Sequence, residues 1–407
     1  MSPRAARMRV RWPAATPVIL GFLCYQFFLC IVNANAFGVS NAIVAVCEAG
    51  LLGWATLRAA PSCRFHEMAL ALFMLTYFMA ACAVRGDVDL DGPRNLAIIL
   101  VCYALGRMQP DREAADKLVW LATGIVMVFA AAEYFLSDSY LHYVNIMRYY
   151  TARGLMSSGT TWVPDNTFTS GFRPQGRNLL PFLGDRRISS VFLEPVSMGN
   201  YAIIVCLWAL SFDAKEKWRA AAHFIAALVL IVACDSRFAS LLVFFLLFLR
   251  FVPVAARRGV IFALPLVAVG GLLLFTHLGL GNPDDDNLTG RLMRSGLATL
   301  DLSFAQVMGV GTLAGLADMG VAYTLEHFGL PLCILLWILF ARPVLKDARA
   351  RRFRLMLAVY ALSILFISGT SFYSSKTAAI LWFLYGVLLG RDKSLPAERQ
   401  QPQGAPC

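Results

Sequence analysis

The chain has few charged residues and lacks the cysteine and histidine spacings of metal sites. Only 15% of its 407 residues are charged, whereas 58% are hydrophobic, which excludes an ordinary soluble domain. Its ten cysteines form no Cys-x-x-Cys pair, so neither a disulfide framework nor a thiolate metal site is expected. His66-Glu67 lacks the second histidine of the zinc-protease helix motif. We therefore expect no metal and no cofactor.

Long apolar segments dominate the sequence instead. The arginines before the first segment resemble a signal-peptide n-region, but no small-residue cleavage site follows, so we expect an uncleaved first span. We predict one all-α polytopic integral-membrane domain over 1–407, with a disordered tail at 391–407. Segment 95–106 is too short to cross the bilayer unaided. The chain has about twelve such segments, at 14–33, 37–57, 67–84, 95–106, 118–136, 188–210, 219–234, 237–252, 259–279, 321–341, 354–370 and 375–390.

Arginine and lysine are concentrated in alternate connecting segments, which is the pattern of cytoplasmic loops. This pattern predicts an inner (cytoplasmic) membrane protein with both termini in the cytoplasm. It also accounts for the net charge of +11 without nucleic acid as a partner. The lipid bilayer is the expected environment.

Two connecting segments on the predicted periplasmic side are long, at 137–187 and 280–320. Loops of this length in a compact protein are usually functional. The first is rich in arginine and aromatic residues. A guanidinium group can bind a phosphate through two parallel hydrogen bonds, so this loop could bind a phosphate-bearing substrate. The alternative is that its arginines and aromatic residues anchor the loop at the membrane interface.

Charged residues at the predicted outer edge form several candidate sites. Arg187 and Glu194 are two helical turns apart, so both could lie on one face of the span beginning at 188. A carboxylate at this depth needs a partner or a role, and the alternative is an ion pair that only positions helices.

Two further groups of arginine lie near the same edge. Asp235-Ser236-Arg237 predicts a tight turn between two spans, with Arg237 either functional or an interfacial anchor. Arg291 and Arg294 would share one face of an amphipathic helix over 290–300 lying along the membrane surface. Together they could clamp a diphosphate or bind lipid headgroups.

Other acidic residues carry weaker signals. Asp87, Asp89 and Asp91 have the spacing that opens a calcium loop, but position twelve of that loop would be Ile98 in a span. The aspartates at 284–286 follow Gly-Asn-Pro and favour a solvated turn over a metal site. Glu48 and Glu133 lie inside spans without an evident partner, and no role is predicted for them.

With these residues in place, the chain resembles the O-antigen polymerase and ligase superfamily, polytopic glycosyltransferases of the GT-C class. The stretch from Arg187 to Tyr201 looks like its Arg-x-Ser-x-x-Phe-x-Glu-Pro segment, and 235–241 looks like its Ser-Arg turn. Residues 290–311, followed by 318–331, look like its large periplasmic loop and the span after it. The resemblance covers about 187–331, and the N-terminal half matches in hydropathy alone.

The resemblance implies a metal-independent transfer at the periplasmic face. An undecaprenyl-diphosphate-linked oligosaccharide is the donor and a sugar hydroxyl the acceptor, with a flippase and a chain-length regulator as possible pathway partners. It implies that Arg237 and Arg291 bind the diphosphate, with Arg187 and Arg294 as secondary contacts. Glu194 or Asp318 would be the base or would orient the acceptor.

Three alternatives remain open. Ligases of this superfamily place a histidine near the position of Asp318, and the nearest histidine here is His327, which favours a polymerase over an O-antigen ligase. A twelve-helix transporter has a similar layout, although the long loops do not occupy matching positions in two halves. A polyprenyl-phosphate sugar transferase would instead use the aspartates at 87–91.

Overall fold

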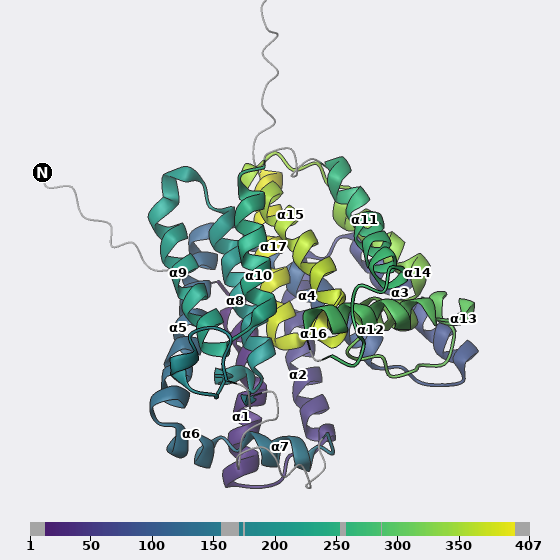
Figure 1. Ribbon diagram of the computed structural model, residues 1–407. Helices are drawn as coiled ribbons and strands as arrows, with labels where there is room; N and C mark the ends of the chain where they lie inside the picture. Colours follow the sequence, from purple (N-terminus) through teal and green to yellow (C-terminus); the bar gives the residue numbers. More distant parts are fainter. Residues whose placement is uncertain (1–12, 156–170, 174–175, 253–257, 286, 395–407) are drawn as a thin grey trace, which may run out of the picture.

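The structure, a computed structural model, describes residues 13–155, 171–173, 176–252, 258–285 and 287–394. Within these ranges the chain is all-α, with one isolated β-bridge between Phe172 and Arg186 and no strands. The predicted fold class is therefore confirmed at the level of an all-helical protein. Figure 1 shows long helices side by side, with shorter helices crossing them.

A helix stands at each predicted apolar segment. Within the described ranges, seven helices are long and apolar enough to cross a membrane: α1 (Thr16–Asn35), α2 (Asn41–Ala59), α3 (Phe65–Arg85), α5 (Arg112–Phe135), α9 (Lys217–Cys234, with the preceding turn), α11 (Arg258–His277) and α14 (Gly320–Ala341). The other segments form α4 (Asp91–Arg107), α8 (Pro195–Ser211), α10 (Arg237–Arg250), α15 (Ala348–Leu365) and α17 (Ser375–Ser394).

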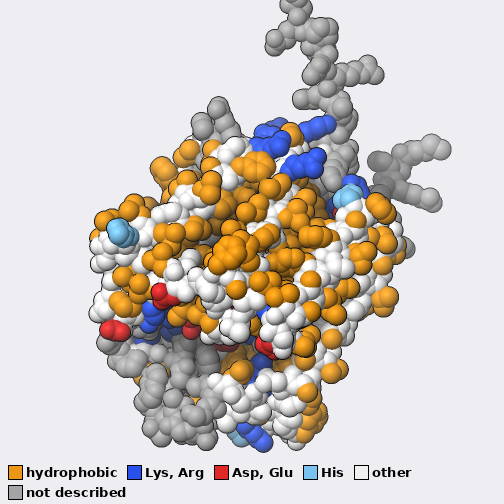
Figure 2. All heavy atoms as spheres, turned by 90° about the vertical axis from the view of Figure 1, so that its right-hand side faces the viewer, with side chains coloured by type: hydrophobic (Ala, Val, Ile, Leu, Met, Phe, Trp, Pro, Cys, Tyr) orange, Lys and Arg blue, Asp and Glu red, His pale blue; other side chains and the backbone are white. Residues whose placement is uncertain are grey.

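The surface agrees with a membrane-embedded protein. Figure 2 shows a broad hydrophobic area on one face, with Lys and Arg gathered at its upper edge. Large apolar side chains such as Leu72, Phe244 and Leu266 are exposed on their helices. In water such an area would be costly, whereas lipid chains solvate it without penalty.

Helix α8 forms the centre of the core. Every residue of Pro195–Ser211 except Val196 is buried, because α9, α10 and α15 pack around it. The helix begins only at Pro195, so the prediction of a helical span from 188 is wrong over 188–194. That segment is irregular apart from one 3₁₀ turn, η4 (Ser190–Phe192), and Leu193 has a left-handed φ of 65°.

Helices α4 and α17 are far apart in the sequence but pack backbone against backbone. Gly386 and Gly390 of α17 form a small-xxx-small pair, the arrangement that lets membrane helices approach closely. A Cβ at Gly386 would lie 2.2 Å from the carbonyl oxygen of Tyr103, and one at Gly106 would lie 1.9 Å from that of Phe383. The contact with α17 therefore stabilises α4, which contains the segment 95–106 that was predicted to be too short to cross the bilayer unaided.

The long connecting segments contain helices of their own. The described part of 137–187 includes α6 (Ser137–Tyr143), α7 (Ile146–Ala152) and η3 (Pro181–Leu183). The segment 280–320 includes α12 (Leu288–Leu300) and α13 (Phe304–Val307), and α12 matches the helix predicted over 290–300. The short helices η1 (Ala60–Ser62), η5 (Ala214–Glu216) and α16 (Thr370–Tyr373) complete the fold.

Connecting segments predicted to share a membrane side contact one another. At one end Arg112 pairs with Asp347, and Arg352 pairs with Asp213 at 2.5 Å. At the other end the Asn41 amide donates to the Arg153 carbonyl oxygen at 2.7 Å. Helix α17 continues to Ser394, so the first residues of the predicted tail are helical, while 395–407 lie outside the described residues.

Candidate functional site

The predicted turn between two spans is present and builds the first part of the site. Helix α9 ends at Cys234, Asp235 adopts a left-handed φ of 47°, and Ser236 caps α10 by accepting a hydrogen bond from the Ala239 N–H at 3.3 Å. An aspartate tolerates this conformation better than most residues. The turn places Arg237 at the first position of α10.

The carboxylate of Asp235 is fully buried and organises the preceding loop. It accepts hydrogen bonds from the backbone N–H of Leu179 at 2.7 Å and of Asn178 at 3.3 Å, and it pairs with Arg173 at 3.1 Å. The first long loop is therefore tied to the α9–α10 turn. Arg173 was not among the predicted site residues, because its only sequence signal was membership of an arginine-rich loop.

Two more arginines bind the end of α9. Arg177 donates to the carbonyl oxygens of Val232 and Ala233, the latter at 2.7 Å, and Arg187 Nε donates to that of Cys234 at 2.9 Å. The last carbonyls of a helix lack intrahelical partners and carry a partial negative charge, so cations stabilise them. Burial, with Arg173 and Arg237 nearby, lowers the pKa of Arg187 to about 10.

Arg237 differs from its neighbours because its side chain is exposed. The side-chain oxygen of Asn178, in the amide orientation that satisfies both groups, accepts a hydrogen bond from Arg237 Nε at 2.8 Å and another from Arg173. We refer to Arg173, Arg177, Arg187, Asp235 and Arg237 as the turn cluster. The structure thus brings the predicted residues Arg187 and Arg237 together.

The proposed helical relation between Arg187 and Glu194 is wrong, since 187–194 is not helical. Ser189 and Ser190 instead donate their backbone N–H groups to the buried carboxylate of Glu133 at 2.9 and 2.6 Å. Glu133, for which no role was predicted, therefore holds this segment in place. Arg187 and Glu194 stand at opposite ends of the segment with different partners.

Glu194 lies at the N-cap of α8 and is half-buried. Its carboxylate accepts hydrogen bonds from the hydroxyl of Tyr150 at 2.6 Å and from that of Ser197 at 3.1 Å. Burial and the charge of Glu194 raise the pKa of Tyr150 well above its usual value, so its hydroxyl remains a donor. The buried amine of Lys376 lies nearby and donates to the Phe192 carbonyl oxygen at 2.8 Å.

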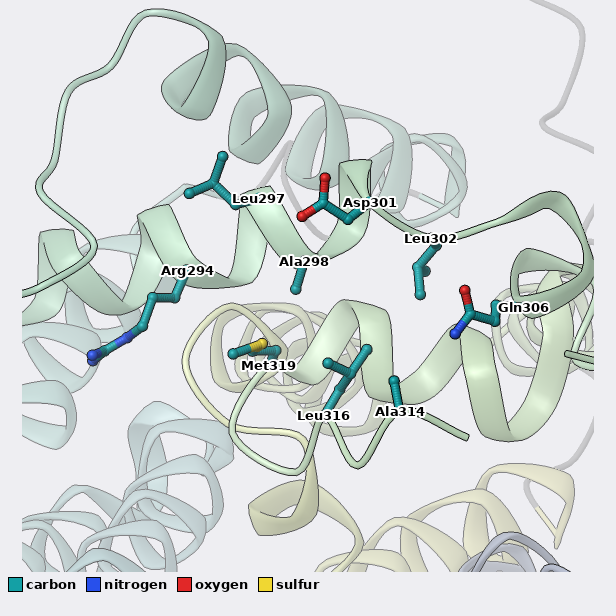
Figure 3. Close-up of a pocket in the computed structure, with 9 residues that line it drawn as sticks. All are labelled: Arg294, Leu297, Ala298, Asp301, Leu302, Gln306, Ala314, Leu316 and Met319. Carbon is teal, nitrogen blue, oxygen red and sulfur yellow. The ribbon is translucent and has the colours of Figure 1, made fainter. Parts of the chain in front are cut away.

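Arg291 and Arg294 lie on α12, which packs against α11 and α14 rather than against the turn cluster's helices. An open groove of about 340 Å³ lies between α12 and the segment 314–319, and Figure 3 shows the residues that line it. Arg294 lies at one end of it and extends away from the other lining residues. We call this pocket the α12 groove. Its lining consists of Arg294, Leu297, Ala298, Asp301, Leu302, Gln306, Ala314, Leu316 and Met319.

Asp318 is exposed in the segment that leads into α14. A buried group of acidic and basic side chains is formed by other residues, on α3, before α4 and on α14. His327 Nδ1 lies 2.7 Å from the carboxylate of Asp89, and Arg85 lies 3.5 Å from the same carboxylate. Arg85 also donates to the carbonyl oxygens of Gly309 and Glu326.

This buried ion cluster surrounds a break in α14. Gly329 has a non-helical φ of 69° and ψ of 150°, and the backbone of Gly309 packs directly against it. Asp89 is therefore committed to an interior ion cluster, whereas Asp87 and Asp91 are exposed. Among the described residues, no group of three or more His, Cys, Asp or Glu side chains could hold a metal ion.

The arrangement offers an exposed arginine, Arg237, at the start of α10 with other cations nearby, and a half-buried carboxylate, Glu194, at the start of the central helix α8. Such groups can stabilise an anionic leaving group and accept a proton. No protein-family model, curated protein or solved structure matches this chain.

Proposed function

We propose that this protein is a membrane glycosyltransferase that polymerises polysaccharide repeat units. It would transfer a glycan from undecaprenyl diphosphate to a sugar hydroxyl of another lipid-linked unit, at the periplasmic face of the inner membrane. The resemblance of 187–331 to O-antigen polymerases suggested this reaction. The observation that supports it most is that the turn cluster and Glu194 flank one short, rigidly held segment, 187–194.

The chemistry is coherent with these side chains. The sugar–oxygen bond to the diphosphate breaks while the acceptor hydroxyl oxygen forms the new bond to the same carbon. Arg237 would stabilise the charge that develops on the departing diphosphate, and the nearby Arg173 adds to the positive field. Glu194 would accept the hydroxyl proton, since each carboxylate oxygen has a second lone pair beyond the one used by Tyr150 or Ser197.

The roles assigned to the other arginines change with the geometry. Arg187 binds the end of α9, so we assign it to holding the turn rather than to the diphosphate. Arg291 and Arg294 lie on α12, which packs against α11 and α14, so we do not assign them to the diphosphate. Asp318 is the exposed alternative to Glu194 as the base.

The direct test uses the full chain in proteoliposomes with a synthetic undecaprenyl-diphosphate repeat unit. We expect a ladder of longer lipid-linked glycans with the native chain and unreacted single units with Arg237→Ala. Long polymer that forms normally in cells but fails to reach lipid A would instead identify a ligase. Absence of any glycosyl transfer by the folded native chain would refute both.

A transporter is the second candidate, and the broken helix α14 favours it. Discontinuous helices beside buried ionisable groups occur at transporter substrate sites, and Asp89, His327 and Arg85 surround this break. Uptake of a lipid-linked glycan or an ion into proteoliposomes, lost with Asp89→Asn and not with Arg237→Ala, would support transport over polymerisation.

A further inference from the structure

The α12 groove is a preformed feature of the protein. Its volume of about 340 Å³ lies in the range typical of small-molecule sites. The buried carboxylate of Glu326 accepts hydrogen bonds from the backbone N–H groups of Ala314 and Leu316, which line one side. On the other side Gly296 of α12 is in close contact with Thr276 of α11. Both walls are therefore fixed by contacts outside the groove.

The chemistry of the lining indicates an aliphatic ligand. Six of the nine lining residues are apolar and none is aromatic, so the groove offers no face on which a sugar could stack (Figure 3). The Gln306 amide is already engaged, since its nitrogen donates to the Thr312 carbonyl oxygen at 3.1 Å and its oxygen accepts from Ser303. A hydroxylated ligand would leave most of its hydrogen-bonding groups unsatisfied there.

The two ends of the groove differ in charge. Arg294 extends beyond one end, whereas Asp301 lies further along α12. An anionic group is favoured beside the arginine and disfavoured beside the aspartate. A ligand with an aliphatic chain and one anionic end would therefore bind with that end at Arg294.

The groove is close to surface that lipid would cover. Helix α12 packs against α11, which exposes Leu266, Val267 and Leu274 along its length. Because α11 is one of the seven candidate spans, aliphatic chains of the bilayer would contact its exposed side chains. The bilayer is thus an abundant source of a ligand with the required chemistry.

We propose that the α12 groove binds one acyl chain of an anionic phospholipid, with the lipid phosphate at Arg294. This lipid would be a structural ligand that holds α12 against the segment 314–319, and it is not a substrate of the transfer reaction. The site is therefore independent of the proposed function.

The experiment measures lipid retention by the purified full chain in detergent, using native mass spectrometry. The added probes are phosphatidylglycerol and phosphatidylcholine with the same acyl chains, which share the phosphate but differ in headgroup and in net charge. We expect phosphatidylglycerol to be retained at least about tenfold better, because the choline cation of phosphatidylcholine offsets the phosphate charge and would be repelled by Arg294. Arg294→Gln should remove this preference, and equal retention of the two lipids by the native chain would overturn the proposal.

A second pair of variants tests the groove itself. Ala298→Trp would fill the groove and should abolish retention of phosphatidylglycerol. Leu300→Trp changes a residue of the same helix that is 55% exposed and lies outside the lining, so retention should persist. Unchanged retention with a folded Ala298→Trp protein would overturn the proposal. Undecaprenyl phosphate displacing phosphatidylglycerol at equal concentration would also overturn it, since the groove would then belong to a carrier lipid.

Discussion

The turn cluster and the α12 groove both contain arginine, but they use it differently. In the turn cluster, Arg173, Arg177 and Arg187 bind the carboxylate of Asp235 and the final carbonyls of α9. At the α12 groove, Arg294 extends from the end of an open, aliphatic cavity. Apart from the exposed Arg237, the first region is closed by its own contacts, whereas the second is open to a ligand.

This difference shows that the role of an arginine at a membrane edge depends on the group to which it donates hydrogen bonds. Where the acceptor is a helix terminus, the guanidinium contributes to stability, because the terminal carbonyls would otherwise be unsatisfied. Where the side chain is exposed beside other cations, as with Arg237, it can take up an anionic ligand. The predictions below separate these two uses.

The largest effect on polymer formation is expected when Glu194 is changed. Glu194→Gln removes the proposed proton acceptor but keeps the size and the hydrogen-bonding atoms of the side chain. Polymer formation in proteoliposomes should fall by about 10²–10⁴-fold. Glu113→Gln, an exposed position at the start of α5, is the matched control. A folded Glu194→Gln protein with native activity would remove Glu194 from the mechanism.

Two substitutions within the turn cluster should have different effects, the first on polymer formation and the second on stability. Arg237→Ala should lower polymer formation by about 10²-fold, as loss of one transition-state donor does, with little change in stability. Arg187→Ala should instead cost about 1.5–3 kcal/mol of stability, since it leaves the Cys234 carbonyl without this charged donor. Thermal unfolding in detergent and the polymer assay together check both. The reverse pattern would exchange the two roles.

A packing change tests the wall of the α12 groove. A Cβ at Gly296 would lie 1.7 Å from the Thr276 hydroxyl oxygen, so Gly296→Val should force α12 away from α11 and cost about 1–3 kcal/mol. The control is Gly271→Val on α11, where a Cβ would meet open space. Unfolding temperatures of the two variants provide the measurement, and equal values would mean that α12 is loosely held.

The smallest effect is expected at Asp318. Its side chain is exposed, so Asp318→Asn should change stability by less than about 0.5 kcal/mol and polymer formation by less than about twofold. A loss of a hundredfold or more in the same proteoliposome assay would transfer the role of base from Glu194 to Asp318.

Local patterns in the sequence were sufficient to predict the all-helical fold and the turn. Apolar segment length located the long helices, Asp235-Ser236 predicted the tight connection, and the amphipathic pattern of 290–300 predicted α12. The helical pairing of Arg187 with Glu194 failed for a physical reason. Glu133, far away in the sequence, binds the backbone of 189–190 and holds it out of a helix.

The residues that were missed depend on contacts between distant segments. Tyr150 meets Glu194 only because α7 folds back onto the start of α8, and Lys376 arrives from α17. Their residue types gave no local signal, since buried tyrosines are common and a single lysine near a span end fits an interfacial anchor. The Asp89–His327 contact likewise joins the residues just before α4 to α14. No sequence spacing connects two positions so far apart in the chain.

The close contact of α4 with α17 has a consequence for biogenesis. Helix α4 is synthesised early, yet the glycine face of α17 that packs against it is synthesised last among the described helices. Until then the close-packed face of α4 around Gly106 lacks its partner helix. A chain stopped before Ser375 should therefore be degraded by quality-control proteases at a rate that Gly386→Leu in the full chain reproduces. Pulse–chase labelling can compare the two half-lives, and a stable truncated chain would show that α4 inserts unaided.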